Sequence, residues 1–196
     1  MTDESPWLIA GLGNPGPGYA GNRHNVGHMV AAELASRVGG AFRSHKANAM
    51  VVEGRAVPGG PKLIVATPNT FMNVSGTPVA SLLRFFKLAP ERLIVIHDDL
   101  DLPFDTVRLK HGGGHGGQNG LRDIIRAVGT PEFTRVRVGI GRPPGRQAPA
   151  DYVLSDFSSV ERRTLPNVIA DAADAVEHIT ARGLLDAQQR FHAPRE

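Results

Sequence analysis

The run Leu93–Ile96 (LIVI) places four consecutive apolar residues between Arg92 and the polar stretch His97–Asp99. A short strand that is apolar at every position must be covered on both faces, which is typical of the interior of a parallel sheet. Parallel strands are joined by crossover connections that usually contain a helix. This run therefore favours an α/β fold.

Other short apolar or alternating runs predict further strands, and segments with a helical period lie between them. The expected strands cover residues 7–12, 49–57, 62–67, 106–110 and 135–141. The expected helices cover residues 25–38, 75–87, 121–128 and most of the chain after the loop 141–149. The sequence predicts one domain over residues 1–196, an α/β fold with a twisted, mixed and largely parallel β-sheet and helices on both faces.

The chain contains no cysteine, which excludes disulfides, thiolate metal sites and cysteine nucleophiles and fits a reducing compartment. Its N-terminal stretch, MTDESPW, is acidic and polar, and no run of about 18 apolar residues occurs. We therefore expect no signal peptide and no membrane span. The expectation is a cytoplasmic protein, and the polar helix faces favour a monomer.

Positive charge is concentrated in one part of the chain. The formal net charge is +3, but the segment Thr106–Ala150 holds eight Lys and Arg residues against Asp123 and Glu132, a balance of +6. A scattered set of such residues is usually only solvated, whereas a one-sided block beside a candidate site favours a polyanionic partner.

The segment 11–16 (GLGNPG) contains the pattern G-x-G-x-x-G, which dinucleotide-binding enzymes use to hold pyrophosphate at a helix N-terminus. Here two prolines flank the third glycine, Gly16, and the helical period begins only at Asn25, so a helix start at Gly16 is disfavoured. The acidic residue expected about 20 positions later is missing, because Glu33 falls inside the predicted helix. We interpret the glycines as a tight turn that lets backbone and substrate approach closely.

Polar side chains follow the ends of several predicted strands, where open α/β sheets usually bind ligands. They are Asn14, His24, Asn25, Asn73, Asn119 and the stretch His97–Asp101. Singly, each has a simple structural explanation, such as a turn for Asn14, a helix N-cap for Asn25 or Asn119, or a surface position for His24. Together they predict a ring of amides around one histidine and one carboxylate.

Four motifs occur between about Leu8 and His192: GLGNPG followed by RHN, then TFMNVSG, HDDLDLP and GGGHGGQNGL. In this order and spacing they closely resemble the bacterial peptidyl-tRNA hydrolase family over nearly the whole chain. The resemblance implies hydrolysis of the ester that joins a peptide to the 3′ end of tRNA, which frees the tRNA for translation. Because an ester is already activated relative to an amide, we expect no metal and no cofactor.

The resemblance also assigns roles to residues. It implies a catalytic role for His24 and a supporting role for Asp98. Its active-site asparagines match Asn14, Asn73 and Asn119, with Tyr19 and Phe71 nearby at the binding site for the peptide and the tRNA end. Its basic residues for the tRNA 5′ phosphate match Lys110 and Arg137. The chain departs from the family at Gln118, where many members have histidine, and at Asp99, where glutamate is common.

These residue types suit the implied chemistry. A neutral imidazole accepts a proton from water near pH 7, and a carboxylate partner fixes its tautomer and stabilises the imidazolium. Neutral amides hold a peptide main chain of any sequence, and Asn73 or Asn14 is a candidate donor to the developing oxyanion. Arg135, on the same predicted strand face as Arg137, is a further candidate for phosphate contact.

Three alternatives remain open. A metal-dependent hydrolase would use His97, Asp98, Asp99, Asp101, His111 and His115, although the glycines around His111 and His115 disfavour the helix of a zinc motif. A serine hydrolase would use Ser75, but no G-x-S-x-G motif occurs and Ser75 more simply caps a helix. An RNA-binding protein without activity would not need His24, Asp98 and the asparagines.

Overall fold

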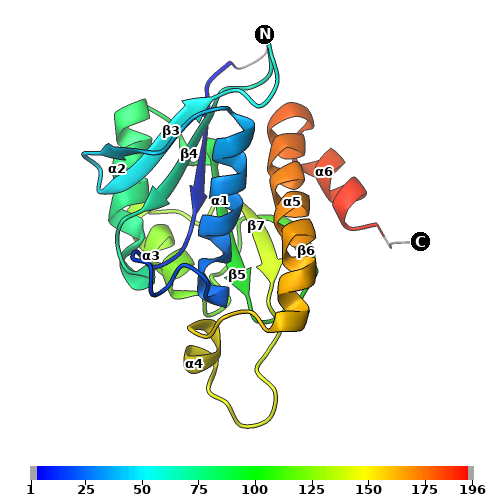
Figure 1. The fold of residues 1–196 in the computed structure, drawn as a ribbon. Helices are drawn as coiled ribbons and strands as arrows, with labels where there is room; N and C mark the ends of the chain where they lie inside the picture. The colour runs from blue at the N-terminus through cyan, green and yellow to red at the C-terminus, as the bar shows by residue number, and fades with distance from the viewer. Residues whose placement is uncertain (1–3, 194–196) are drawn as a thin grey trace.

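The computed structural model describes residues 4–193; residues 1–3, part of the acidic N-terminal stretch, and residues 194–196 lie outside the described residues. One seven-stranded sheet lies between two layers of helices (Figure 1). Its strands are β1 (Trp7–Gly11), β2 (Arg43–His45), β3 (Ala49–Gly54), β4 (Leu63–Pro68), β5 (Leu93–Asp99), β6 (Val107–His111) and β7 (Thr134–Gly139). The α-helices are α1 (Val26–Arg37), α2 (Gly76–Phe86), α3 (Asn119–Val128), α4 (Pro149–Val153), α5 (Ser159–Arg182) and α6 (Leu184–Phe191).

The sheet has the strand order β2-β3-β4-β1-β5-β7-β6. Its four central strands, β4, β1, β5 and β7, run parallel, while β3, β2 and β6 add antiparallel pairs at the two edges. The predicted mixed sheet with helices on both faces is confirmed. The parallel strands all end at the same edge of the sheet, the lower edge in Figure 1, so the loops that follow them meet there.

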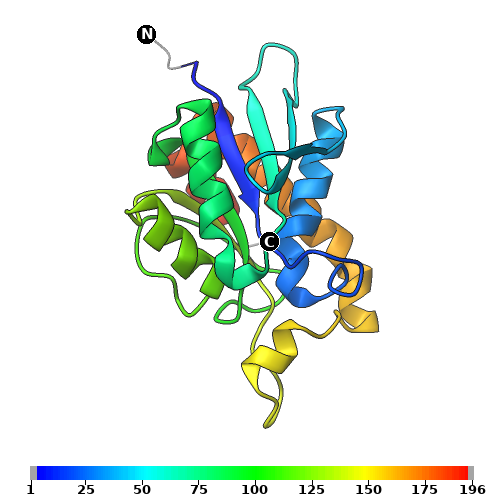
Figure 2. The ribbon, with the colours of Figure 1, turned by 90° about the vertical axis from the view of Figure 1, so that its left-hand side faces the viewer.

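Each face of the sheet has its own core, and the side view in Figure 2 shows helices on both sides of the sheet. Ile94 and Ile96 of β5 face the core that includes residues of α1 and α5, and Leu93 and Val95 face the core formed with α2 and α3. All four side chains are fully buried, as the apolar run predicts. No helix in residues 4–193 is both long and apolar enough to cross a membrane.

The sequence predictions missed one strand and several helix caps. Strand β2 was not predicted, and the helical stretch expected after residue 149 is divided into α4, α5 and α6. Asn25 and Ser75 occupy N-cap positions, but neither side chain caps its helix. The cap of α3 is Gln118 rather than Asn119, because the Gln118 side chain accepts a hydrogen bond from Leu121 N at 2.7 Å. The cap expectations for Asn25, Ser75 and Asn119 are therefore wrong.

Gly11, in the segment 11–16, and Gly27, in α1, let a helix pack directly against the sheet. A Cβ on Gly27, in the first turn of α1, would lie 2.5 Å from both Leu12 N and Ile96 O, and a Cβ on Gly11 would lie 2.2 Å from Gly27 O. Only glycine permits this approach of α1 to the ends of β1 and β5. The close approach is therefore between backbone segments of the protein itself. It brings the residues before α1 next to the end of β5.

Candidate active site

A cleft of about 450 Å³ lies at the carboxyl ends of the parallel strands. Its walls come from the loops after β1, β4 and β5, from the loop before α3 and from α4. The structure brings together in this cleft seven residues predicted for the site, namely Asn14, Tyr19, His24, Phe71, Asn73, Asp98 and Asn119. The apolar side chains of Val153 and Leu154 at the end of α4 also line it, and sequence reasoning missed them because they follow a stretch rich in proline and glycine.

His24 and Asp98 form the polar centre of the cleft. His24 Nδ1 lies 2.7 Å from Asp98 Oδ2, and both side chains are almost entirely buried, with exposed fractions of 13% and 2%. A carboxylate can only accept from this nitrogen, so Nδ1 carries the proton and Nε2 keeps its lone pair. The pair therefore presents one basic nitrogen on a histidine that lines the cleft.

Asn14 is fixed beside this pair by hydrogen bonds on its backbone and its side chain. Its Oδ1 accepts from Met72 N at 2.7 Å. Its backbone N–H donates to Asn25 Oδ1 and its carbonyl accepts from Asn25 Nδ2, both at 2.9 Å. Because Oδ1 is occupied by a backbone donor, the amide orientation is determined and Nδ2 remains as a donor. Asn25 thus acts on the loop of Asn14, which explains why it does not cap α1.

Gln118 binds the second oxygen of the same carboxylate. Its Nε2 donates to Asp98 Oδ1 at 3.1 Å while its Oε1 accepts from Leu121 N. Both oxygens of the buried Asp98 are therefore hydrogen-bonded, one to His24 and one to Gln118.

The rim of the cleft differs from this interior. Phe71, Asn73 and Asn119 are exposed, and Phe71 packs edge-on against Tyr19 with 6.0 Å between the ring centroids. Within residues 4–193 the side chains of Asn73 and Asn119 make no hydrogen bond. The rim thus offers two free amides and an aromatic surface to a ligand.

The segment after α4 holds the loop that carries His24. The buried side chain of Arg23 forms an ion pair with Glu161 at 2.8 Å and stacks over Tyr152 at 4.0 Å. Asn22 Nδ2 donates to Asp156 Oδ1 at 2.9 Å. Burial of Glu161 opposes its ionisation, but the Ser158 N–H and Arg23 outweigh this effect and lower the pKa of Glu161. Arg23, the residue before His24, is therefore held in place by the C-terminal part of the chain.

The basic residues of the segment 106–150 differ in burial and in their partners. The expectation that Arg135 contacts phosphate is wrong, because its side chain is buried and donates to the carbonyls of Gly113, Gly114 and Pro131. Arg137 pairs with Asp99 at 2.9 Å and remains partly exposed. Lys110 is exposed and has no ion pair in the described part of the chain. Neither Lys110 nor Arg137 lines the cleft.

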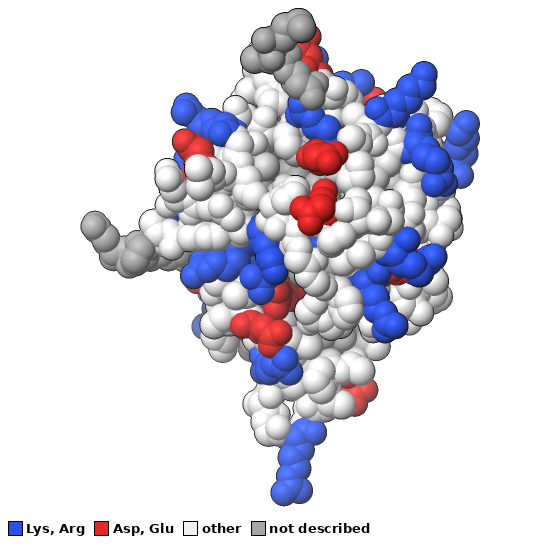
Figure 3. Space-filling model, turned by 180° about the vertical axis from the view of Figure 1, so that it is seen from behind, with Lys and Arg blue, Asp and Glu red and all other residues white. Residues whose placement is uncertain are grey.

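Figure 3 shows the face of the molecule that α2 and α3 cover. Lys and Arg side chains occur over much of this face, and several of them lie beside Asp or Glu. Three cations of the basic segment are paired in this way, Arg126 with Asp123, Arg137 with Asp99 and Arg142 with Asp101. Asp123 is already counted in the balance of +6, whereas Asp99 and Asp101 lie outside the segment and neutralise part of that balance.

Two histidines near the cleft, the buried His97 and the partly buried His28, are held neutral. Burial lowers the pKa of His28 to about 4, and its ring lies where a Cβ on Gly13 would approach within 2.7 Å. Burial also lowers the pKa of His97, despite the opposing effects of the Asp98 carbonyl and nearby acids. His97 Nδ1 lies 2.9 Å from that carbonyl. Both rings belong to the packed support of the site.

The geometry does not favour the metal and serine alternatives. Among residues 4–193, no group of three or more His, Asp or Glu side chains is placed to hold a metal ion. Of the candidate ligands, His97 is buried and His111 pairs with Glu132 at 3.2 Å. Ser75 is fully buried and its hydroxyl donates to Met72 O at 2.7 Å.

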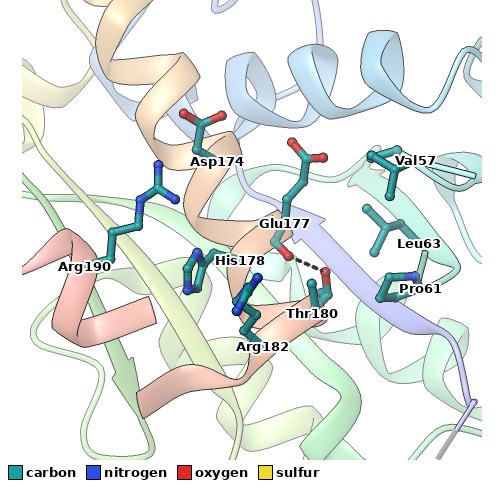
Figure 4. Close-up of a pocket in the computed structure, with 11 residues that line it drawn as sticks. Val57, Pro61, Leu63, Asp174, Glu177, His178, Thr180, Arg182 and Arg190 are labelled. Carbon is teal, nitrogen blue, oxygen red and sulfur yellow. Dashed lines mark hydrogen bonds between the residues drawn. The ribbon is translucent and has the colours of Figure 1, made fainter. Parts of the chain in front are cut away.

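A second cavity, of about 360 Å³, lies between α5, α6 and the segment that joins β3 to β4 (Figure 4). Its charged groups are largely satisfied by other protein groups. Arg37 bonds to both Asp174 and Glu177, at 2.7 and 2.5 Å, and His178 pairs with Asp186. None of the residues predicted for the site lines this cavity. The first cleft is therefore the candidate active site.

Comparisons with known proteins show the family to which the chain belongs. The peptidyl-tRNA hydrolase family profile matches residues 8–196. The chain is 65% identical to the peptidyl-tRNA hydrolase of Leifsonia xyli, over 96% of this chain and 98% of that one. It is 59% identical to the enzyme of Paenarthrobacter aurescens, over 98% of both chains. A crystal structure of peptidyl-tRNA hydrolase from Acinetobacter baumannii superposes with a TM-score of 0.87 at 35% identity, covering 100% of this chain and 98% of that one. The chain belongs to the peptidyl-tRNA hydrolase family.

Proposed function

We propose that this protein hydrolyses the ester between a peptide and the 3′ end of tRNA, with His24 as general base. The hydrogen bond between His24 Nδ1 and Asp98 Oδ2 carries the proposal, because it leaves Nε2 as a proton acceptor in the cleft. Nε2 takes a proton from a water molecule as its oxygen bonds to the ester carbonyl carbon. Asp98 stabilises the imidazolium that forms.

The reaction is completed by the same histidine. When the tetrahedral intermediate collapses, the bond from carbon to the tRNA 3′ oxygen breaks, and the imidazolium returns its proton to that oxygen. The products are a peptide with a free carboxylate and a tRNA with a free hydroxyl group. Proton transfer by a positioned side chain typically contributes a factor of about 10² to 10⁴ to the rate.

Asn14 is the donor that we assign to the developing oxyanion. Its Oδ1 is held by Met72 N, so its Nδ2 donates from a fixed position and needs no reorganisation during the reaction. Asn73 has no such restraint, since its exposed side chain makes no hydrogen bond in the described part of the chain. The sequence left Asn14 and Asn73 as equal candidates, and the restraint on Asn14 is the reason to prefer it.

The rim binds the substrate around the reacting ester. Asn73 and Asn119 donate to and accept from the peptide main chain, which suits a substrate of any sequence. Tyr19 and Phe71 offer ring surfaces to the terminal base of the tRNA or to apolar side chains of the peptide.

Lys110 and Arg137 bind phosphate of the tRNA outside the cleft. Lys110 is free to do so, whereas Arg137 must share its guanidinium between the phosphate and Asp99. Replacement of Lys110 by Ala should reduce the salt dependence of substrate binding by about one unit in the slope of log K against log salt. The same change at Arg122, an exposed cation on α3, is the matched control.

The proposed reaction is tested with tRNA charged with an N-blocked amino acid and with the same tRNA carrying the unblocked amino acid. We expect the wild-type protein to release the blocked amino acid rapidly, with and without a chelator, and to leave the unblocked substrate intact. His24→Ala should bind the blocked substrate without hydrolysing it. Loss of activity with the chelator, or full activity of His24→Ala, would contradict the mechanism.

A further inference from the structure

Gln118 connects the candidate catalytic pair to the start of a helix. Its two amide atoms have different partners, since Oε1 accepts from Leu121 N at 2.7 Å and Nε2 donates to Asp98 Oδ1 at 3.1 Å. The backbone donor at Oε1 fixes which end of the amide faces Asp98. A flipped amide would set two oxygens against each other.

Asp98 depends on this donor for its orientation. The carboxylate is buried, and among residues 4–193 Gln118 supplies the one side-chain hydrogen bond to Oδ1. A buried carboxylate oxygen without a donor is costly. With Oδ1 held by Gln118, the rotation that would take Oδ2 away from His24 Nδ1 is opposed.

The position of Gln118 is itself determined by the surrounding backbone. A Cβ on Gly120 would lie 2.5 Å from Met72 Sδ and 3.1 Å from Gln118 Oε1, so glycine is required for this close packing of the start of α3. The buried Arg135 donates to the carbonyls of Gly113 and Gly114 in the preceding loop. Arg135 therefore stabilises the loop that leads to Gln118.

We propose that Gln118 is a positioning residue for the hydrolysis: it holds Asp98 so that Oδ2 remains on His24 Nδ1. The inference rests on the proposed function of His24 and Asp98. Gln118 does not touch the reacting atoms in this role, and it acts through Asp98. The Gln118 amide does not ionise near neutral pH. Its hydrogen bond to Asp98 therefore does not change with pH in the range in which His24 acts as a base.

Gln118 also caps α3, and the test must separate the two roles. Gln118→Asn keeps a good N-cap residue but shortens the side chain by one methylene, so the donor no longer reaches Asp98. Gln188→Asn is the matched control, because Gln188 makes a comparable bond to Leu109 O on β6, outside the cleft.

The first measurement is steady-state hydrolysis of the blocked aminoacyl-tRNA. We expect Gln118→Asn to lower kcat about tenfold with little change in KM and in the unfolding midpoint, because a single hydrogen bond that orients the base is lost. Gln188→Asn should behave as the wild type. Wild-type kcat in Gln118→Asn, or a loss of kcat that follows a loss of folded protein, would overturn the proposal.

The second measurement follows His24 itself by NMR of the labelled imidazole. We expect the Nδ1 proton signal to broaden or disappear in Gln118→Asn, because the donor that orients Asp98 is lost, and to remain as in the wild type in Gln188→Asn. The other titratable groups around the pair, His97, Asp99, His115 and Arg137, are the same in all variants.

The two measurements distinguish this inference from the proposed function. If the wild type failed to hydrolyse the substrate while Gln118→Asn still altered the His24 signal, the function would fail and the positioning of Asp98 would stand. If hydrolysis depended on His24 but Gln118→Asn left the His24 signal and kcat unchanged, only the role of Gln118 would fail.

Discussion

The interior and the rim of the cleft are built in different ways. In the interior, Asn14, His24, Asp98 and Gln118 are tied to one another or to backbone groups by hydrogen bonds of 2.7 to 3.1 Å. At the rim, Asn73 and Asn119 are exposed and their side chains have no hydrogen-bond partner in residues 4–193. Fixed groups stabilise a transition state without reorganisation, whereas free groups adapt to varied ligands. The interior should therefore control kcat, and the rim should control KM.

His24→Ala should give the largest effect and so the strongest test of this division. Removal of the general base should lower kcat roughly a thousandfold. KM should change little, because binding rests on the rim and on cations outside the cleft. Steady-state kinetics and a tRNA binding measurement check both parts. A large rise in KM with kcat retained would contradict the assignment of the interior to the chemistry.

Asn14 offers a more selective change within the interior. Asn14→Asp keeps an oxygen that accepts from Met72 N but removes the Nδ2 donor and adds a negative charge near the oxyanion. We expect kcat to fall roughly a hundredfold or more while the fold is retained, which circular dichroism can verify. If Asn73→Asp lowered kcat more than Asn14→Asp did, the oxyanion donor would be at the rim and not in the interior.

The free energy of unfolding should depend on pH through His28, which packs beneath the interior of the cleft, and not through the rim. The pKa of His28 is about 4 in the folded protein and about 6.5 when unfolded, so protons bind preferentially to the unfolded chain between these values. The stability that depends on a neutral His28 is complete above pH 6.5 and is lost as the pH falls to 4, by about 3 kcal/mol at most.

Urea unfolding from pH 8 to pH 4 measures this loss. His28→Phe removes the ionisation and keeps a ring of similar size beside Gly13, so the free energy of unfolding should fall less steeply with decreasing pH. Some slope should remain, since burial lowers the pKa of His97 in the same direction. An unchanged slope in His28→Phe would mean that the ring does not stay neutral in the folded protein.

The sequence predicted the position of the site better than its internal contacts. The apolar run at Leu93–Ile96 determined a parallel sheet, and polar residues that follow parallel strands meet at one edge, so the gathering of Asn14, His24 and Asp98 followed from local patterns. Which groups cover a strand face depends on segments that are distant in the sequence. Arg135 and Arg137 share one face of β7, yet only Arg135 is covered by the loop carbonyls of residues 113–114.

The elements that were missed have weak local patterns for physical reasons. Strand β2 has only three residues, Arg43–His45, which is too short to show alternation. Helix α4 has only five residues and follows a loop rich in proline and glycine, so its separation from α5 within the expected helical stretch was not predicted. Gln118 was identified as a departure from the family, but its contacts to Asp98 and Leu121 depend on how closely α3 approaches β5. Such distances arise from packing and cannot be obtained from one sequence.

Replacement of the rim amides should give the smallest effect. Asn73→Ala and Asn119→Ala each remove one neutral contact to the substrate, so we expect KM to rise about fivefold for each with kcat nearly unchanged. The double variant should show the product of the two single effects, because free side chains that do not bond to each other act independently. A drop in kcat for either single variant would mean that substrate binding fixes this side chain for the chemical step, and the distinction between interior and rim would then hold only for the free protein.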